Sequence, residues 1–361
     1  MSKVEKYFED YIKNFKSAKV NKWCYEDGCV LLGAIKMYQA TGKDLYKKFV
    51  FDVVDQYVNE DGTMNFYDNK KYHIDNIYAG NALFFAYDET GNEKYRKAIE
   101  LQMEQLRNHP RTASGNFFHK DIYPNQVWLD GINMGLVFYM NYETRFGGKE
   151  HYQDIMNQLR NVRKNAYNEE KGLYYHAYDE SKQMAWADKE TGCSPNFWLR
   201  AMGWYMVALI DMIEGTDQAI YENYDELKRL FKEALKGLLQ YQDKDSKLFY
   251  QVIDRADVEG NYLETSGSLM IAYAMLKACR MKVILSEKYE KTAREILDSV
   301  IDNKLVEENG KLALTDMCLV AGLSDTRDGS VEYYLSEERG SDDHKGVGAL
   351  MMAYAESILL K

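Results

Sequence analysis

The hydrophobic and polar positions of the chain alternate between two kinds of helical segment. One kind is apolar around most of its circumference, which is typical of a buried helix. The other has apolar residues at i, i+3 and i+4 with charged residues between them, so only one face needs to be covered. The apolar segments are residues 29–38, 77–87, 132–142, 204–213, 269–278 and 347–360. The amphipathic segments are residues 47–58, 93–106, 152–162, 224–241 and 287–301. This pattern predicts six inner helices surrounded by outer ones.

Short blocks recur between these segments and mark the turns of a repeat. YQATGKDLY at 38–46 is echoed by YDETGNEKY at 87–95 and, more loosely, by YETRFGGKEHY at 142–152. In each block a glycine follows an apolar helix, where a left-handed residue commonly ends a helix. Six repeats in 361 residues average about 60 residues each, enough for two helices and two loops. We therefore expect an all-α protein, an (α/α)6 barrel in which six helical hairpins form a toroid. An open helical solenoid without an enzymatic site is the alternative.

The composition supports one large helical domain. Hydrophobic residues make up 46% and charged residues 29% of the chain, which can therefore bury a large core. The chain has only 3 prolines, as suits a mostly helical protein. Length alone suggests two or three domains, but no linker interrupts the repeats, so we expect a single barrel domain over residues 1–361. Two Tyr-rich segments, 172–180 and 248–254, are predicted to form loop hairpins on one rim.

Charge and cysteine content narrow the class of partner. The formal net charge is −11 and no basic run is present, which disfavours nucleic acid because its phosphates are bound by clustered Lys and Arg. The five cysteines are scattered and form no C-x-x-C pair, which indicates reduced thiols and no zinc site. The acidic N-terminal stretch lacks the apolar region of a signal peptide, and no run of 18 apolar residues occurs. Nucleotide-binding motifs are also missing. We expect a cytoplasmic monomer with no membrane partner, no metal and no cofactor.

Charged or ionisable residues lie near the start of each inner helix. They are Asp27, Asp75, Asp130, Arg200, Glu264 and His344. In a toroid the starts of all six inner helices meet at one end of the barrel, so these side chains would line a pocket at its mouth. A carboxylate at a helix start can also be a plain N-cap, which is the alternative for each of them.

Two of these carboxylates are predicted to be catalytic. Asp130 lies in PNQVWLDGINMG, and Asp75, in YHIDNIYAG, holds the equivalent position of the preceding repeat. Neighbouring carboxylates raise the proton affinity of one of the two, which suits a group that must be a protonated acid near neutral pH. Asp130 and Asp75 are therefore the candidate acid–base pair.

Aromatic and basic residues complete the predicted pocket. CSPNFWLRAMGW brings Trp198, Arg200 and Trp204 to one helix start. Indole faces can stack on sugar rings, and the guanidinium fork matches a carboxylate, although core aromatics beside a capping arginine are the alternative. The further rim candidates are Tyr25, His119, Lys120, Trp128 and His176. We expect all of these side chains to contact a substrate.

With these residues in view, the whole chain resembles glycoside hydrolase family 105, the unsaturated rhamnogalacturonyl hydrolases, and their unsaturated glucuronyl relatives. The matching blocks run from WCYEDG and HIDN through FFHKDIYPNQVWLDG, YYHAYD, FWLRAMGW and ETSGS to AGLSDTRDGSVEYYLSEERGSDDHKGVGA. WLDG and RDGSVEYYLSE are the specific ones, because helix patterning does not require them. The resemblance implies an (α/α)6 barrel whose substrate carries the 4,5-unsaturated uronic acid left by a polysaccharide lyase.

The resemblance also implies the reaction and the roles of residues. Asp130 would protonate C4 of the enol ether and then activate the water that adds to C5, after which the hemiketal opens and releases the partner sugar. Asp75 resembles the second carboxylate of the family site, and Arg200, with His or Lys nearby, would hold the uronate. The positions that resemble substrate contacts are His176, Trp198, Arg200 and Trp204; Trp128, His119 and Lys120 fall in a matching block, and Tyr25 aligns with no family role.

The expected substrate is a short oligosaccharide of the rhamnogalacturonan or pectin type. Lyase products of glycosaminoglycan or ulvan are the alternative within the family, because small loop changes can alter the second sugar. A toroid glycosidase or epimerase that uses ordinary acid–base pairs, and a carbohydrate-binding toroid without catalysis, are the alternatives outside it.

Overall fold

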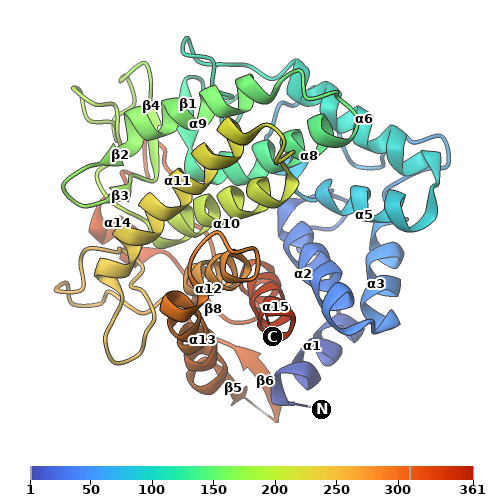
Figure 1. The fold of residues 1–361 in the computed structure, drawn as a ribbon. Helices are drawn as coiled ribbons and strands as arrows, with labels where there is room; N and C mark the ends of the chain where they lie inside the picture. The colour runs from blue at the N-terminus through green and yellow to red at the C-terminus, as the bar shows by residue number, and fades with distance from the viewer. Residues whose placement is uncertain (1, 309, 361) are drawn as a thin grey trace.

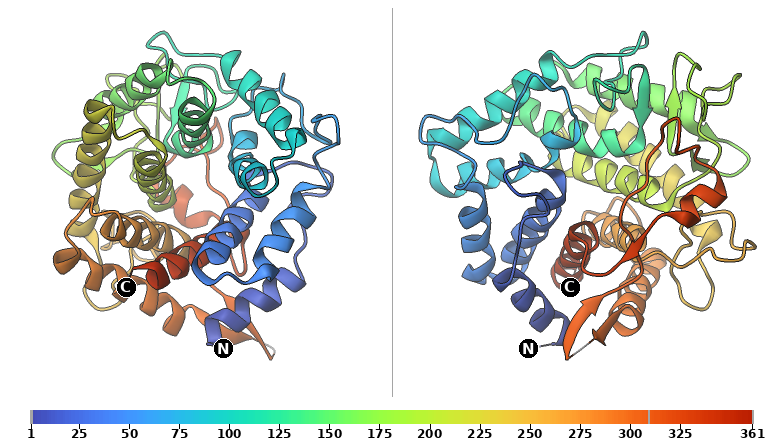
Figure 2. Two further views of the ribbon diagram at one scale, coloured as in Figure 1. Left: turned by 45° about the vertical axis from the view of Figure 1, so that its right-hand side comes forward. Right: turned by 180° about the vertical axis from the view of Figure 1, so that it is seen from behind.

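The computed structural model describes residues 2–308 and 310–360, and its helices alternate between an outer and an inner ring (Figures 1 and 2). The outer helices are α1 (Lys3–Lys13), α3 (Asp44–Val54), α6 (Glu93–Arg107), α9 (Tyr152–Ala166), α11 (Tyr221–Leu238) and α13 (Ser286–Asn303). The inner positions hold α2 (Tyr25–Thr41), α4 (Asp75–Tyr78) with α5 (Asn81–Thr90), α7 (Leu129–Gly131) with η1 (Ile132–Leu136) and α8 (Val137–Arg145), α10 (Leu199–Gly215), α12 (Thr265–Arg280) and α15 (His344–Leu359). The (α/α)6 barrel predicted from the two kinds of segment is confirmed.

The inner ring is closed, which distinguishes it from an open solenoid. Each inner helix contacts the next one along the chain, and the last, α15, packs against the first, α2. The two backbones approach closely at small residues: a Cβ on Gly348 of α15 would overlap the carbonyl group of Cys29 on α2. Only glycine allows this approach, so the seam between the first and last inner helices is fixed by backbone contact.

The inner helices all run in the same direction along the barrel axis. At their starts the rings of Tyr25 on α2 and Trp204 on α10 lie 6.5 Å apart. At their ends Lys36 Nζ of α2 lies 3.2 Å from Glu214 of α10. The same end buries Lys277 of α12, whose Nζ is 2.7 Å from Glu214. A buried lysine requires such partners, so this end is filled by ion pairs and the opposite end forms the mouth.

Helix α1 completes the outer ring and was not predicted from the amphipathic pattern. It contacts α3, and Lys3 Nζ reaches the carbonyl oxygen of Ile301 on α13 at 3.5 Å. Ser2 and Glu5 form a capping box at its start, and its apolar face packs inward, where Phe8 meets Tyr354 of α15 edge-on. The Ser-x-x-Glu signature was visible in the sequence.

Two of the six inner positions are interrupted near the mouth. The second is divided into α4 and α5 at Ala79–Gly80, and the third contains the π-helical turn η1 directly after α7. A π-turn widens the helix by one residue and is frequent at functional sites. Both interruptions lie within a few residues of a predicted catalytic carboxylate.

The connecting loops contain the remaining short strands and helices. They are β1 (Gln126–Trp128), β2 (Tyr167–Asn168), β3 (Leu173–Tyr174), β4 (Ala177–Asp179), η2 (Leu239–Tyr241), β5 (Leu305–Glu308), β6 (Lys311–Leu314), β7 (Met317–Cys318), α14 (Val331–Ser336) and β8 (Arg339–Gly340). None of the helices in the described residues combines the length and the apolar character that a membrane span requires.

The Tyr-rich segment 172–180 is not a self-contained hairpin, which corrects that prediction. Its first strand, β3, pairs back with β2, whereas β4 pairs with β1 of the preceding repeat. Segment 248–254 likewise pairs outside itself, through bridges from Val252 to Trp198 and from Tyr250 to Leu263. A two-residue strand gains little from its own turn, so the partners are set by the packing of neighbouring repeats.

Candidate active site

The starts of the inner helices meet at the mouth, and the structure distinguishes capping residues from the others. Glu264 is the N-cap of α12 and accepts hydrogen bonds from the backbone N–H groups of Ser266 and Gly267. Asp75 and Asp130 make no such bond at the starts of α4 and α7. The capping alternative therefore holds for Glu264 and fails for the two predicted catalytic carboxylates.

Asp75 is buried in a cluster of three basic side chains. Lys120 Nζ lies 3.2 Å from Asp75 Oδ2, His119 Nε2 lies 3.4 Å from Oδ1, and His73 Nδ1 lies 3.6 Å from Oδ2. The backbone builds this cluster, because His73 and Lys120 face each other in a β-bridge and Ile74 N–H donates to the carbonyl of His119. Three of the sequence candidates are thus brought together in one cluster.

The sequence predicts a raised proton affinity for one of the two carboxylates, Asp75 or Asp130. The charges around Asp75 have the opposite effect on it. Burial acts to raise the pKa of Asp75, but Lys120, followed by His119 and His73, outweighs it and holds the pKa of Asp75 well below its usual range. Burial lowers the pKa of His119 to about 3 and that of His73 to about 4, against the attraction of Asp75. Asp75 is therefore a stable carboxylate paired with a charged lysine, and it is not the protonated member of the pair.

A Lys120→Met variant is expected to raise the pKa of Asp75. A depressed carboxylate pKa contributes stability that is fully present above the unfolded-state value of about 3.9 and is lost as pH falls through the folded-state value. The variant should therefore be less stable than the wild type near neutral pH, and the difference should narrow below about pH 4. Thermal unfolding midpoints from pH 7 to pH 3 measure it, with Lys71→Met at an exposed lysine as the matched change. A difference that stays constant over this range would contradict the assignment.

Asp130 faces a second, separate set of side chains. Its Oδ2 lies 3.3 Å from His176 Nε2, and the other ring nitrogen, Nδ1, lies 2.7 Å from the hydroxyl of Tyr334 on α14. His176 is 0% exposed, whereas the side chain of Asp130 keeps 15% of its surface exposed. The Leu129 N–H donates to the His176 carbonyl at 3.0 Å. This bond joins the start of α7 to the residue before β4, next to the Asp130 carboxylate. Asp130 is thus a partly exposed acid group attached to a buried histidine.

The tryptophans surround these two sets and are themselves buried. Trp128 stacks on His119, with ring centroids 4.4 Å apart, and on Tyr123 at 5.4 Å, and its edge meets His176. Trp198 lies against His176 at 4.7 Å. Trp128 contacts His119 of the Asp75 cluster and His176 of the Asp130 set, so this residue links the two.

Arg200 is buried beside Trp198, with its guanidinium carbon 4.8 Å from the indole centroid. It donates to the backbone carbonyl of Cys318, to that of Leu319 at 3.4 Å and to the Ser266 hydroxyl at 3.4 Å. Burial opposes its charge, but the surroundings, first the Cys318 thiol and Glu264, raise the pKa of Arg200 above its ordinary value. The guanidinium fixes the loop of β7 over the mouth, and its contact with a uronate stays a prediction.

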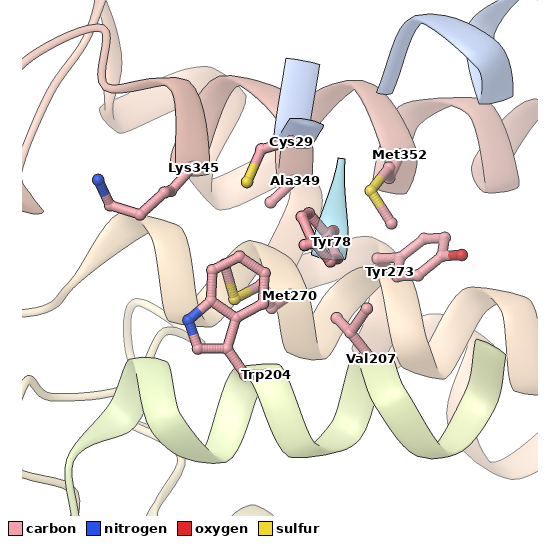
Figure 3. Close-up of a pocket in the computed structure, with 9 residues that line it drawn as sticks. All are labelled: Cys29, Tyr78, Trp204, Val207, Met270, Tyr273, Lys345, Ala349 and Met352. Atoms are coloured by element: carbon pink, nitrogen blue, oxygen red, sulfur yellow. The ribbon is translucent and has the colours of Figure 1, made fainter. Parts of the chain in front are cut away.

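A narrow axial pocket lies below the mouth (Figure 3). Trp204 of α10 projects into it opposite Lys345 and Ala349 of α15, and the remainder of the lining is apolar or aromatic. Tyr25 lies at the edge of this region, its ring 5.9 Å from Lys345 Nζ and 6.5 Å from the Trp204 ring. Trp204 and Tyr25 therefore lie deeper along the axis, apart from the side chains that touch Asp130.

Two site residues were not predicted from the sequence and are found in the structure. They are His73 beside Asp75 and Tyr334 beside His176. Lys345, which follows His344 at the predicted start of the last inner helix, lies at the axial pocket. Tyr334 lies in RDGSVEYYLSE, a block that helix patterning did not require, and this was the available signal. In the described part of the chain no group of three or more His, Cys, Asp or Glu residues converges in a way that could hold a metal ion.

Comparisons with known proteins agree with this fold and identify the family. Residues 1–361 match the family model described as Glycosyl Hydrolase Family 88. A solved glycoside hydrolase of family 105 from C. acetobutylicum ATCC 824 is 42% identical and superposes with a TM-score of 0.93, covering 98% of this chain and 99% of that one. The unsaturated rhamnogalacturonyl hydrolase YesR of Bacillus subtilis is 25% identical over 300 residues, 81% of this chain and 78% of the relative.

A more distant structure shares the fold alone. The unsaturated glucuronyl hydrolase of Bacillus sp. GL1 is 13% identical with a TM-score of 0.67, covering 97% of this chain and 93% of that one. The family expected from the WLDG and RDGSVEYYLSE blocks is confirmed by the matches that cover the whole chain. The protein is a glycoside hydrolase of (α/α)6-barrel architecture, and it belongs to Glycosyl Hydrolase Family 88, with strong similarity to a family 105 enzyme.

Proposed function

We propose that the protein hydrolyses short oligosaccharides that carry a 4,5-unsaturated uronic acid at the non-reducing end, the products of polysaccharide lyases. The observation that carries this proposal is the arrangement of Asp130, a partly exposed carboxyl group at the mouth whose Oδ2 lies against the buried His176. Rhamnogalacturonan or pectin fragments are the proposed substrates, which the name of the Bacillus subtilis relative supports.

In the proposed reaction Asp130 acts first as an acid and then as a base. Its proton goes to C4 of the enol ether, and the positive charge left at C5 is shared with the ring oxygen. Water then adds to C5 and returns a proton to the Asp130 carboxylate, so the side chain ends in its starting state. The hemiketal formed at C5 opens and releases the partner sugar. The partner sugar is not displaced directly from the anomeric carbon. The rule that predicts inversion or retention from the separation of two carboxylates therefore does not apply.

The other charges at the mouth suit an anionic sugar. Lys120 beside Asp75 and Arg200 beside Trp198 provide positive charge within a protein whose net charge is −11. The Asp75 carboxylate is held ionised by Lys120, so we assign the proton transfer to Asp130. We assign substrate contact at the mouth to Lys120 and Arg200, and a contact deeper along the barrel axis to Trp204.

The ultraviolet absorbance of the C4=C5 bond provides the test. Purified protein is given unsaturated rhamnogalacturonyl, glycosaminoglycan and ulvan disaccharides, together with a saturated galacturonyl disaccharide. The absorbance should fall for the unsaturated substrates, fastest with rhamnose as the partner sugar, while the saturated one stays intact. Cleavage of the saturated disaccharide alone would refute the hydration mechanism. Binding of every substrate without turnover would favour the carbohydrate-binding alternative.

The origin of the proton predicts the position of deuterium in the product. In heavy water we expect one deuterium at C4 of the released keto sugar, delivered by Asp130. Protons beside a ketone also exchange slowly with solvent, so product made in light water and then transferred to heavy water gives the background for mass spectrometry and proton NMR. Early samples without deuterium at C4 above this background would rule out the assigned role.

The proposal extends to the organisation and location of the chain. We propose that residues 1–361 act as a single catalytic barrel in the cytoplasm. All five cysteines are unpaired and buried, which suits a reducing compartment.

A further inference from the structure

We propose that Tyr334 is a positioning residue that acts through His176 on Asp130. Its hydroxyl fixes which nitrogen of His176 carries the proton, and His176 in turn holds Oδ2 of Asp130, so the reactive proton is carried on Oδ1. This inference rests on the proposed function for its kinetic consequences, although its structural part can be tested without any activity.

The three groups form a chain of contacts that ends at the mouth. Tyr334 Oη lies 2.7 Å from His176 Nδ1, and His176 Nε2 lies 3.3 Å from Asp130 Oδ2. Tyr334 and His176 are both fully buried, so neither ring offers a surface to a sugar. Both nitrogens of His176 already face protein groups. Its role is therefore to hold Asp130, and Tyr334 is the group behind it.

Aromatic packing keeps the histidine ring in place between its two partners. Trp198 is parallel to Tyr334, with centroids 6.1 Å apart and an interplanar angle of 16°, and it lies 4.7 Å from the His176 ring. The edge contact with Trp128 at 5.1 Å supports the ring from another side. This packing leaves the imidazole little room to rotate. If its hydrogen bond with Tyr334 is lost, the ring can respond only by a change in which nitrogen carries the proton.

The direction of the hydrogen bonds follows from the burial of Tyr334. Burial raises the pKa of Tyr334 well above its ordinary value, and nearby Tyr333 and Asp130 add to the effect, so the hydroxyl keeps its proton. A neutral phenol can donate this bond, so we assign Tyr334 O–H as the donor to Nδ1 and place the imidazole proton on Nε2. Nε2–H then faces Asp130 Oδ2 at 3.3 Å, a close contact that does not have hydrogen-bond geometry in the structure.

Asp130 then has two inequivalent oxygens. Oδ2 is buried and faces His176 Nε2, so the exposed part of the side chain lies elsewhere than on Oδ2. An oxygen that faces an N–H group at 3.3 Å is a poor place for a second proton, because the two hydrogens would point at each other. Oδ1 therefore carries the proton that goes to C4 and later receives the proton from water. Holding one oxygen in place in this way orients the acid for transfer.

The test removes only the hydroxyl, in Tyr334→Phe. We expect kcat to fall by about 10-fold to 100-fold, with KM within a factor of about two, because the lost interaction matters only for orienting the acid. Nitrogen-15 NMR of the six histidines, with His176 assigned by its absence in His176→Gln, should show the Nε2–H tautomer in the wild type and loss of that preference in Tyr334→Phe. Tyr174→Phe is the matched change, since it removes another buried hydroxyl, one that donates to Glu233 at 3.0 Å, and it should keep the wild-type rate.

A double variant distinguishes positioning from loss of packing. If Tyr334 acts through His176, adding Tyr334→Phe to His176→Gln should lower kcat no further. A full additional loss in the double variant, a wild-type rate in Tyr334→Phe, or an Nδ1–H tautomer of His176 in the wild type would each overturn the inference. The tautomer of the wild type is measurable even if Tyr334→Phe does not fold. If the wild type hydrates no unsaturated sugar, the proposed function fails, while the NMR result still judges the positioning.

Discussion

Replacing Asp130 by Asn is expected to lower kcat on the unsaturated disaccharide by about 10³-fold to 10⁴-fold. The amide cannot donate a proton to C4 or accept one from water, so both halves of the reaction are lost together. The shape of the side chain is retained, and the contact with His176 at the position of Oδ2 can be kept by the amide oxygen. KM should therefore change little, and initial rates of absorbance loss measure the effect.

The matched change for this variant is Asp121→Asn. Asp121 is exposed and lies nine residues before Asp130 in the same loop, so it controls for the loss of one charge near the mouth. This variant should keep the wild-type rate. An Asp130→Asn protein that retains full activity would show that another group delivers the proton.

Replacing Asp75 by Asn is expected to lower kcat by about 10²-fold and also to destabilise the protein. The change leaves the partly buried Lys120 without its counter-charge, 3.2 Å from where the carboxylate had been, and alters the partner of His119. Removing one member of a buried pair costs more than removing both, because the remaining charge is left uncompensated. Kinetics together with thermal unfolding midpoints measure the two effects.

A double variant decides how Asp75 acts. If its main task is to hold Lys120, Asp75→Asn combined with Lys120→Met should be more stable than Asp75→Asn alone, because no uncompensated charge is left. Its activity should be no lower than that of the poorer single variant. Strictly additive losses of stability would show that the two side chains act independently, contrary to the contact between them.

The ring of helices could be predicted from the sequence because it depends on local patterns. The six all-round apolar segments and the glycine-containing turns each specify a helix within about a dozen residues, and their number fixes the barrel. The N-terminal helix was not predicted, although Ser2 and Glu5 carry a capping signature at its start. The identity of the mouth residues was also available, since inner helix starts must converge in a toroid.

The charges and contacts at the mouth could not be predicted in the same way. The pairing of Asp75 with Lys120 depends on a β-bridge between residues 73 and 120, and the pairing of His176 with Tyr334 spans 158 residues. Neither separation leaves a periodic signal. The contacts of Arg200 could not be predicted either. Its guanidinium donates to the carbonyl oxygens of Cys318 and Leu319, and the sequence of their loop has no pattern that predicts contact with α10.

The seam between α2 and α15 has a consequence for how the protein is made. The N-terminal part of a chain leaves the ribosome first. Until α15 has been made, the apolar surfaces of α2 and α12 that pack against it therefore remain uncovered. The contacts that close the ring join residues near 30 to residues near 350, and contacts of such long sequence separation form slowly. The mouth is therefore complete only after α15 has been made and has closed the ring against α2.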